Sequence, residues 1–326
     1  MTPPKDELKI FAGRGTKELA GRVCQHLGIP LGRAKTSAFP DGELLVKLEE
    51  DVRGRDCWVV ISTCDPVNDN LLELLIFIDA LRRASARRVS VVVPYFGYAR
   101  QDRKSEGRTP ITAKLVANLI TSAGADRLVA IDLHAAQIQG FFDIPVDHLS
   151  GSEVFVQHFT ERRPELGDLC LVSPDVGNVK VAEGMAVLLD ADLAIIHKRR
   201  VGATEVETGR LIGDVRGKTV LMYDDMISTA GTVCEAARLV MEEGATDVIA
   251  AATHPVLVGM AMQRLAESPI RQIVVTDTIP NGLRCAPIKD KLHELSVGPL
   301  LGEALHRIHH DRSVSEMFAR TAGVKR

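Results

Sequence analysis

The chain lacks several features that mark common classes of protein. It has six cysteines among 326 residues, but no C-x-x-C pair, so neither a zinc knot nor a disulfide scaffold is expected. The N-terminus, MTPPKDELKI, has no apolar signal core. The longest apolar run, LLELLIFIDAL, is cut by Glu73 and Asp79 and cannot span a bilayer. We therefore expect a cytoplasmic protein with reduced thiols and no membrane partner.

The chain also has no large net charge and no low-complexity segment. The net charge of −3 gives no overall footprint for nucleic acid, so a nucleic-acid partner is not expected. An anionic ligand would have to be met by local basic clusters. The length is that of two domains of ordinary size, each able to bury its own core.

Apolar, β-branched runs alternate with helical patterns along the chain. Most of the runs are continuous, as expected for strands with both sheet faces covered. The predicted helices include residues 70–83, 112–122 and 233–243. Strand–helix–strand order predicts an α/β fold with parallel sheets flanked by helices. The predicted strands are Trp58–Ser62, Val89–Pro94, Leu128–Asp132, Leu169–Ser173, Leu193–His197, Thr219–Tyr223, Val248–Thr253 and Ile273–Thr276.

Two stretches, WVVISTCDPVNDNLLELLIFIDALRRASARRVSVVVPY and KTVLMYDDMISTAGTVCEAARLVMEEGATDVIAAATHP, have a similar pattern. Laid over each other, they bring Asp65 near Asp225. We infer an internal duplication with domains at 1–149 and 150–326, and the last helix as a candidate to pack back on the first domain. Only the second copy keeps a loop of small residues.

That loop lies in LMYDDMISTAGT, residues 221–232, which is the most informative stretch of the chain. An apolar strand leads into two acids, Asp224 and Asp225. The small residues 228–232 then leave backbone N–H groups uncovered at the start of a helix, which suits a phosphate. The acids suit sugar hydroxyls or a bridging metal, so the pair of features indicates a phosphorylated sugar. A simple N-cap is the alternative.

Two further motifs could bind a nucleotide. FPDGE, residues 39–43, is either a plain turn or a site where Phe39 stacks on a base while Asp41 and Glu43 accept hydrogen bonds. YARQDRKSEGRTP follows a strand end and gathers basic residues; it is either a solvated loop or a polyphosphate site. In that motif Arg100 could pair with phosphate and Gln101 could read an amide or amine edge.

Residues at three strand ends could bind a metal ion or contact a phosphoryl group during its transfer. Asp132 and His134 are two apart, share a face of an extended chain, and can hold a divalent ion or orient a phosphate. Asp175, in SPD, is a further candidate ligand for Mg²⁺. HKRR, with Lys198 and Arg200, precedes a small polar segment; it is either a surface hairpin or a cationic loop that closes over a phosphoryl group.

Taken together, these motifs resemble those of the ribose-phosphate pyrophosphokinases across nearly the whole chain. FPDGE, YARQDRK, DLHAAQIQGFF, VSPD, HKRR and DDMISTAGT stand in that family's order and at about its spacing. The resemblance implies two phosphoribosyltransferase-like domains. It also implies transfer of the β,γ-diphosphoryl group of ATP to O1 of ribose 5-phosphate with Mg²⁺, in a homohexamer whose ATP site is shared between subunits.

The resemblance also assigns roles by position. Lys198 and Arg200 resemble the catalytic pair. His134, Asp132 and Asp175 resemble the metal-side residues. The ATP contacts would be Phe39, Asp41, Glu43, Arg100, Gln101 and His134. The ribose 5-phosphate contacts would be Asp224, Asp225, Ser228, Thr229, Ala230, Gly231 and Thr232.

One position departs from the family pattern, since many relatives carry Asp where this chain has Ser228. Serine keeps a small side chain with a hydroxyl donor, so we expect the phosphate cradle to survive. Counterparts of the family's allosteric site would be Arg53, Ser85, Arg108 and Ser313, although Asp51 replaces a more neutral residue beside them.

Three alternatives remain open at this point. A phosphoribosyltransferase shares the DD…TGT loop but has no need of the FPDGE, RQDRK and DLH motifs. A catalytically inactive regulatory homologue should have lost some of His134, Lys198, Arg200 or the acid pair, and all are present. A nucleotide-binding module would form no AMP from ATP and ribose 5-phosphate.

Overall fold

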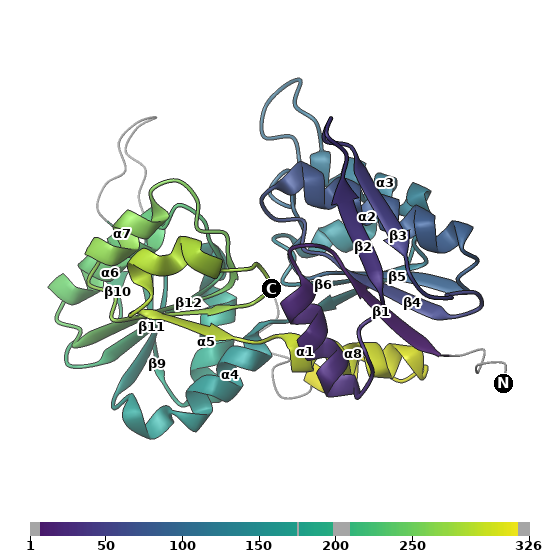
Figure 1. Ribbon diagram of the computed structural model, residues 1–326. Helices are drawn as coiled ribbons and strands as arrows, with labels where there is room; N and C mark the ends of the chain where they lie inside the picture. The colour runs from purple at the N-terminus through teal and green to yellow at the C-terminus, as the bar shows by residue number, and fades with distance from the viewer. Residues whose placement is uncertain (1–6, 175, 198–208, 319–326) are drawn as a thin grey trace. The chain divides into compact units, whose positions relative to one another are not determined.

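The computed structural model describes residues 7–174, 176–197 and 209–318, and the chain folds into two compact units. The first unit holds residues up to 149 together with 278–280 and 296–316; the second holds most of 150–295. Figure 1 shows a sheet with helices in each unit. The predicted fold class, α/β with parallel sheets flanked by helices, is confirmed.

The first unit is built on a five-stranded parallel sheet in the order β1-β4-β5-β6-β7. A separate antiparallel hairpin, β2–β3, lies outside this sheet. The strands are β1 (Leu8–Ala12), β2 (Ala34–Ala38), β3 (Leu44–Leu48), β4 (Asp56–Val60), β5 (Arg88–Val93), β6 (Arg127–Ile131) and β7 (Val146–Leu149). The helices are α1 (Lys17–Leu27), α2 (Val67–Arg83), α3 (Thr112–Ala123), the short η1 (Ala136–Phe141), and α8 (Gly298–His309), which returns from the end of the chain.

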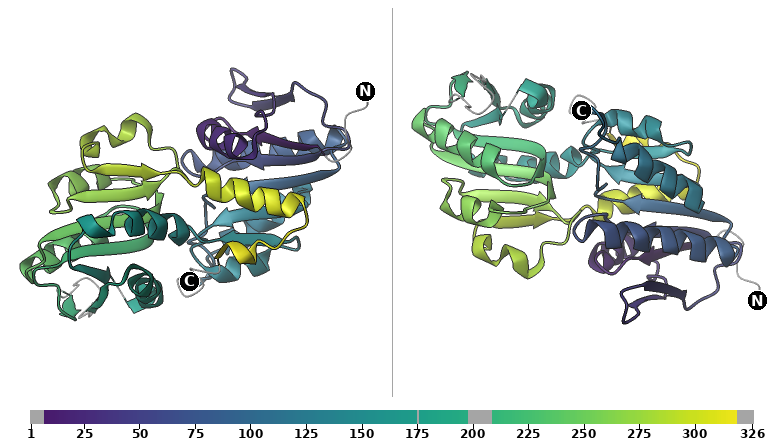
Figure 2. Two further views of the ribbon diagram at one scale, coloured as in Figure 1. Left: turned by 90° about the horizontal axis from the view of Figure 1, so that it is seen from below. Right: turned by 90° about the horizontal axis from the view of Figure 1, so that it is seen from above.

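Helices cover both faces of this sheet (Figure 2). Apolar residues of α2 and α3 pack with one face of the strands in a single core. On the other side α8 packs closely on α1. A Cβ atom on Gly302 would lie 3.0 Å from Cβ of His26, and one on Gly298 would lie 2.7 Å from Cβ of Arg22. These two glycines, four residues apart on one helical face, allow the two helices to approach each other closely.

The second unit is built on a seven-stranded sheet in the order β10-β9-β8-β11-β12-β13-β14, parallel except for the edge strand β10. One core joins a sheet face to α4 and α5, and another joins the opposite face to α6, α7 and η4. The strands are β8 (Leu169–Ser173), β9 (Asp192–His197), β10 (Arg210–Ile212), β11 (Thr219–Ile227), β12 (Asp247–Pro255), β13 (Gln272–Thr276) and β14 (Leu292–Leu295). The helices are α4 (Ser152–Glu161), α5 (Val179–Leu189), α6 (Gly231–Glu242) and α7 (Ala261–Glu267), with short turns η2 (Arg163–Glu165), η3 (Val176–Asn178) and η4 (Gly282–Ile288). The last described element, η5 (Ser315–Phe318), spans the boundary between the residues of the two units.

The two sheets share one register, which supports the internal duplication. The first rows are Leu8–Asp56–Arg88 in one sheet and Leu169–Thr219–Asp247 in the other. Later rows agree as well, since Leu128 pairs with Val146 as Ile273 pairs with Leu292. Counted from these rows, Asp65 is the counterpart of Ser228. The sequence alignment that placed Asp65 near Asp225 is wrong by three residues. It superposed the acidic residues, whereas the strand pairing sets the true correspondence.

All eight predicted strands are present, but β11 is longer than expected. It continues past Tyr223 to Ile227, and Asp224 pairs with Ala252 in its ladder. The neighbouring strand β12 also runs on to Pro255 and offers it backbone partners. The acids therefore lie within a strand. Since α6 already begins at Gly231, the connecting loop is only Ser228–Ala230.

Candidate functional site

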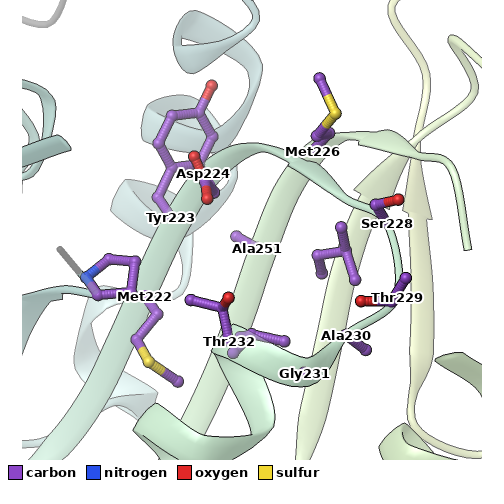
Figure 3. Close-up of a pocket in the computed structure, with 13 residues that line it drawn as sticks. Met222, Tyr223, Asp224, Met226, Ser228, Thr229, Ala230, Gly231, Thr232 and Ala251 are labelled. Carbon is purple, nitrogen blue, oxygen red and sulfur yellow. The ribbon is translucent and has the colours of Figure 1, made fainter. Parts of the chain in front are cut away.

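The candidate phosphate loop lies between β11 and α6 and lines a pocket (Figure 3). The pocket encloses about 670 Å³ of space, part of it open to solvent. It is lined by Pro174, Met222, Tyr223, Asp224, Met226, Ile227, Ser228, Thr229, Ala230, Gly231, Thr232, Val233 and Ala251. The structure thus gathers the predicted residues 228–232 and Asp224 around one hollow.

The start of α6 faces this pocket without a side-chain cap. Its N-cap residue, Ala230, has a φ of +59° in the left-handed region and makes no capping hydrogen bond. The backbone carbonyl of Ala230 accepts from the N–H of Cys234 at 3.1 Å, which begins the helix. The first N–H groups of a helix carry a partial positive charge, so this end of α6 can bind an anion. The simple N-cap alternative for this loop does not match the geometry.

The two acids differ in their surroundings. Asp225 is 4 % exposed, whereas Asp224 is half-buried and borders the pocket. The Asp225 backbone N–H donates to Oδ1 of Asp224 at 2.8 Å, which fixes the Asp224 carboxylate beside the pocket. A carboxylate in this position can accept hydrogen bonds from the hydroxyls of a sugar whose phosphate lies on the loop.

Backbone and side-chain groups of neighbouring segments hold the carbonyl groups of the loop. The backbone N–H groups of Leu257 and Val258 donate to the carbonyls of Ile227 and Ser228 at 2.9 and 3.0 Å. Nη1 of Arg264, on α7, donates to the carbonyl of Thr229 at 2.9 Å. Arg264 has no place in any motif of the sequence, and sequence reasoning missed it.

The FPDGE motif forms the tip of the β2–β3 hairpin. The Phe39 N–H donates to the Glu43 carbonyl at 2.8 Å, and the Glu43 N–H donates to Oδ1 of Asp41 at 3.2 Å. The predicted turn is thus present, and Gly42 in it has a φ of +94°. Phe39 is 50 % exposed, so its ring is available to a ligand or another chain.

Other predicted residues follow strand tips of the first sheet. Arg100 and Gln101 are exposed after β5, and the Gln101 side chain accepts from the Thr112 hydroxyl at 2.5 Å. Asp132, half-buried after β6, has a φ of +38°, and the nearby His134 is exposed.

His148, which the sequence reasoning did not single out, supports the turn between Asp132 and His134. Its Nε2 accepts the backbone N–H of Leu133 at 2.9 Å from the adjacent strand β7. The Asp132 N–H donates to the carbonyl of Leu149 at 3.0 Å, so β7 holds this turn at two points.

Of the candidate allosteric residues, two come together. Nη1 of Arg53 donates to Oγ of Ser85 at 3.0 Å, and Ser85 and Arg108 both have φ in the left-handed region. The Ser313 carbonyl instead accepts from Arg307 at 2.9 Å.

Three predicted site residues, Asp175, Lys198 and Arg200, lie outside the described residues. Within the described ranges, no group of three or more His, Cys, Asp or Glu side chains could hold a metal ion. None of the helices in those ranges is long and apolar enough to cross a membrane.

The cysteines do not contribute a nucleophile. All six are buried thiols that form no disulfide. Burial raises the pKa of Cys57 to about 12 and that of Cys24 and Cys170 to about 11. Burial also raises the pKa of the Cys234 thiol, just past the loop. These thiols stay protonated at neutral pH and are unreactive.

Comparison with known proteins gives one consistent result. Residues 8–124 match the N-terminal domain of ribose phosphate pyrophosphokinase, and residues 201–319 match the phosphoribosyl synthetase-associated domain. A ribose-phosphate pyrophosphokinase of Rhodopirellula baltica is 58 % identical over 96 % of this chain and 98 % of its own length. Another, from Gloeobacter violaceus, is 52 % identical over 96 % of this chain and 93 % of its own.

A solved structure agrees with these sequences. The crystal structure of phosphoribosylpyrophosphate synthetase from Mycobacterium smegmatis superposes with a TM-score of 0.85 at 44 % identity, covering 94 % of this chain and 99 % of that one. Two family domains match the chain, and its relatives match over nearly their whole length. The chain therefore belongs to the ribose-phosphate pyrophosphokinase family.

Proposed function

We propose that this chain transfers the β,γ-diphosphoryl group of ATP to O1 of ribose 5-phosphate, giving 5-phosphoribosyl 1-diphosphate and AMP. The observation that carries the proposal is the uncapped start of α6 beside Asp224 in one pocket. A phosphate on the loop Ser228–Thr232 and sugar hydroxyls on the acids would hold a phosphorylated sugar at both ends. Membership of the family supplies the donor and the reaction.

In this reaction O1 of the sugar attacks the β-phosphorus, and the bond from that phosphorus to the α-phosphate oxygen breaks. AMP leaves, and the proton of O1 passes to solvent or a nearby base. Such a transfer depends on positioning and on stabilising the charge of the phosphoryl oxygens, so it needs no covalent nucleophile. Lys198 and Arg200 are our candidates for contacting the transferring group, and Asp224 and Asp225 for orienting the acceptor.

ATP binding belongs to the first unit in this proposal. Arg100, Gln101 and His134 would contact the nucleotide from the strand tips of the first sheet. The exposed Phe39, on its hairpin, would stack on the adenine of a neighbouring copy, together with Asp41 and Glu43. A homohexamer with shared ATP sites is therefore part of the proposal.

The family also implies Mg²⁺, and the residues present are compatible with it. Mg²⁺ usually takes one or two carboxylates together with substrate phosphates and water, so it does not need a cage of protein ligands. Asp132, His134 and Asp175 are our candidate ligands for the ion. When bound, it would neutralise part of the charge of the triphosphate.

The test is AMP formation from ATP, measured with and without ribose 5-phosphate. We expect AMP only when both are present. A binding module would give none, and a phosphoribosyltransferase would instead consume 5-phosphoribosyl 1-diphosphate with a base. Parallel assays with inorganic phosphate and ADP test regulation through Arg53, Ser85, Arg108 and Ser313.

Lys198→Ala separates an active enzyme from an inactive homologue. We expect it to lower turnover far more than ATP binding, because its charge would act on the transferring group. Equal turnover in the variant and the parent chain would contradict the role of Lys198.

A further inference from the structure

Arg264, on α7, contacts the backbone of the phosphate loop. Its Nη1 donates to the carbonyl of Thr229 at 2.9 Å. The same nitrogen would lie 3.4 Å from a Cβ atom on Gly231, so the guanidinium lies against the first residue of α6. Arg264 is half-buried and is not among the residues that line the pocket.

This hydrogen bond fixes the orientation of one peptide group. A trans peptide is planar, and its C=O and N–H point in opposite directions. Because the Thr229 carbonyl points to Arg264, the N–H of Ala230 points away from it. Thr229 and Ala230 line the pocket and Arg264 does not, from which we infer that this N–H is directed toward the pocket. In this orientation the loop offers a donor to an anion.

The same peptide has a reason to turn over if nothing holds it. Ala230 has a φ of +59°, which is unfavourable for a residue with a Cβ atom. Rotating the peptide between Thr229 and Ala230 changes ψ of the first and φ of the second, and would take Ala230 out of the left-handed region. The rotated peptide would point a carbonyl oxygen at the bound phosphate. A contact that holds the Thr229 carbonyl therefore keeps the loop able to bind an anion.

We propose that Arg264 is a positioning residue that holds the Thr229–Ala230 peptide in its anion-binding orientation and so sets the affinity for the sugar phosphate. The inference rests on the proposed function, which places that phosphate on the loop. Arg264 acts through the backbone, and its positive charge beside α6 adds to the attraction for a dianion.

The rest of α7 is held independently of Arg264. Nζ of Lys291 donates to three carbonyls at the C-terminal end of the helix, those of Leu265, Ala266 and Ser268, at 3.1, 3.0 and 2.9 Å. The Ala261 N–H donates to the Val258 carbonyl at 3.2 Å at the other end. Removing the Arg264 guanidinium should leave the helix in place, which makes a specific test possible.

The test compares Arg264→Met and Arg264→Lys with the parent chain. Arg264→Met should raise KM for ribose 5-phosphate about tenfold, the usual size for loss of a charged hydrogen bond, while KM for ATP and kcat change less than about twofold. Arg264→Lys should recover part of the loss. Arg271→Met, which removes a half-exposed arginine paired with Asp247, is the matched control and should change neither KM.

Ala230→Gly tests the peptide orientation itself. Glycine adopts positive φ without strain, so a rotated peptide gains less from leaving that region. The double variant Ala230→Gly with Arg264→Met should therefore bind ribose 5-phosphate more tightly than Arg264→Met alone. A merely structural role for Arg264 would give no such recovery.

Calorimetric titration of each variant with ribose 5-phosphate alone keeps the two proposals separate. If the parent chain forms no AMP, the proposed reaction is wrong, and the calorimetric affinities still decide the role of Arg264. The role is overturned if Arg264→Met binds ribose 5-phosphate as the parent does. It is also overturned if affinity for ribose 5-phosphate and for ATP fall together with the melting temperature.

Discussion

The two units use the same strand–loop–helix connection in opposite ways. In the first unit β4 leads to α2 through residues 61–66, and in the second β11 leads to α6 through 228–230. The strands before these loops have the same register, so Ile61 and Ser62 are the counterparts of Asp224 and Asp225. The loop of the first unit is occupied by hydrogen bonds within that unit, whereas the loop of the second unit borders a pocket.

The contacts of the first loop show how it is filled. The Thr63 hydroxyl accepts the N–H of Gly97 at 2.7 Å, and the Asn70 side chain donates to the Cys64 carbonyl at 2.9 Å. The Ser62 hydroxyl donates to the carbonyl of Thr278. Pro66, with no N–H, stands at the N-cap of α2. The duplicated scaffold thus allows either a sealed or an open helix start, and residue choice at a few positions selects between them.

The largest expected effect concerns a buried ion pair found at the start of β4. Asp56, fully buried, accepts from Nε of Arg88 at 2.8 Å and lies 2.7 Å from Nδ1 of His309 on α8. Its counterpart in the second sheet is the uncharged Thr219. Asp56→Asn should lower the free energy of unfolding by about 3 kcal/mol at pH 7, because Arg88 loses a buried partner. Urea unfolding measures the change.

The same variant should also change the response to acid. Burial alone would raise the pKa of Asp56, but the hydrogen bonds from Arg88 and His309 outweigh it, and the pKa is lowered. Its stabilising contribution is then complete above the unfolded pKa of about 3.9 and is lost as pH falls through the lower folded pKa. The difference between parent and variant should vanish in strong acid. Asp247→Asn, in a half-exposed pair, should cost under about 0.5 kcal/mol.

The second prediction removes one charge from the pair of acids, Asp224 and Asp225, that precedes the open loop. Asp224→Asn keeps an oxygen that can accept the Asp225 N–H but removes the carboxylate from the pocket. We expect kcat/KM for ribose 5-phosphate to fall about a hundredfold, since hydrogen bonds to a charged acceptor are the stronger ones. AMP formation at varied ribose 5-phosphate measures it. A loss confined to ATP affinity would move Asp224 out of the sugar site.

A third experiment breaks the sealed loop. A Cβ atom on Gly97 would lie 2.3 Å from the Thr63 carbonyl oxygen, which is backbone and cannot move aside cheaply. Gly97→Ala should therefore destabilise the protein by about 2 kcal/mol through overpacking. Gly107→Ala, with no atom within 4 Å of its Cβ, is the control. Unfolding of both variants in urea gives the comparison, and equal stabilities would mean that the sealed loop yields without cost.

Much of the scaffold could be predicted from the sequence because continuous apolar runs such as Leu169–Ser173 are typical of buried parallel strands. The strands β1, β7, β10 and β14 and the β2–β3 hairpin were not predicted, and most of them are shorter or less apolar than the central strands. The loop at 228–232 could be singled out because its small residues stand between an apolar strand with two acids and a helix. Arg264 was not, because its contact joins positions 35 residues apart and only the fold brings them together.

A fourth prediction uses His148, another residue that only the fold reveals. Its Nε2 accepts the Leu133 N–H and so supports the turn that carries Asp132 and His134. His148→Phe should raise KM for ATP about fivefold by removing a neutral hydrogen bond, with KM for ribose 5-phosphate unchanged. His148→Gln keeps an acceptor and should behave nearly as the parent does. Equal losses in both variants would show that ring packing, and not the acceptor, supports the turn.

The smallest expected effect is at Ser228, the position whose counterpart in the sealed loop is Asp65. Ser228 borders the pocket, and its carbonyl is held by the Val258 N–H at 3.0 Å. Since that backbone contact does not involve the side chain, Ser228→Asp should leave the loop intact. An added carboxylate would repel the bound phosphate but could accept a hydrogen bond from a sugar hydroxyl, so the two effects oppose each other. We expect KM for ribose 5-phosphate to change by less than about threefold. A change above tenfold would mean that the side chain at 228, and not the backbone of the loop, sets the affinity of the open site.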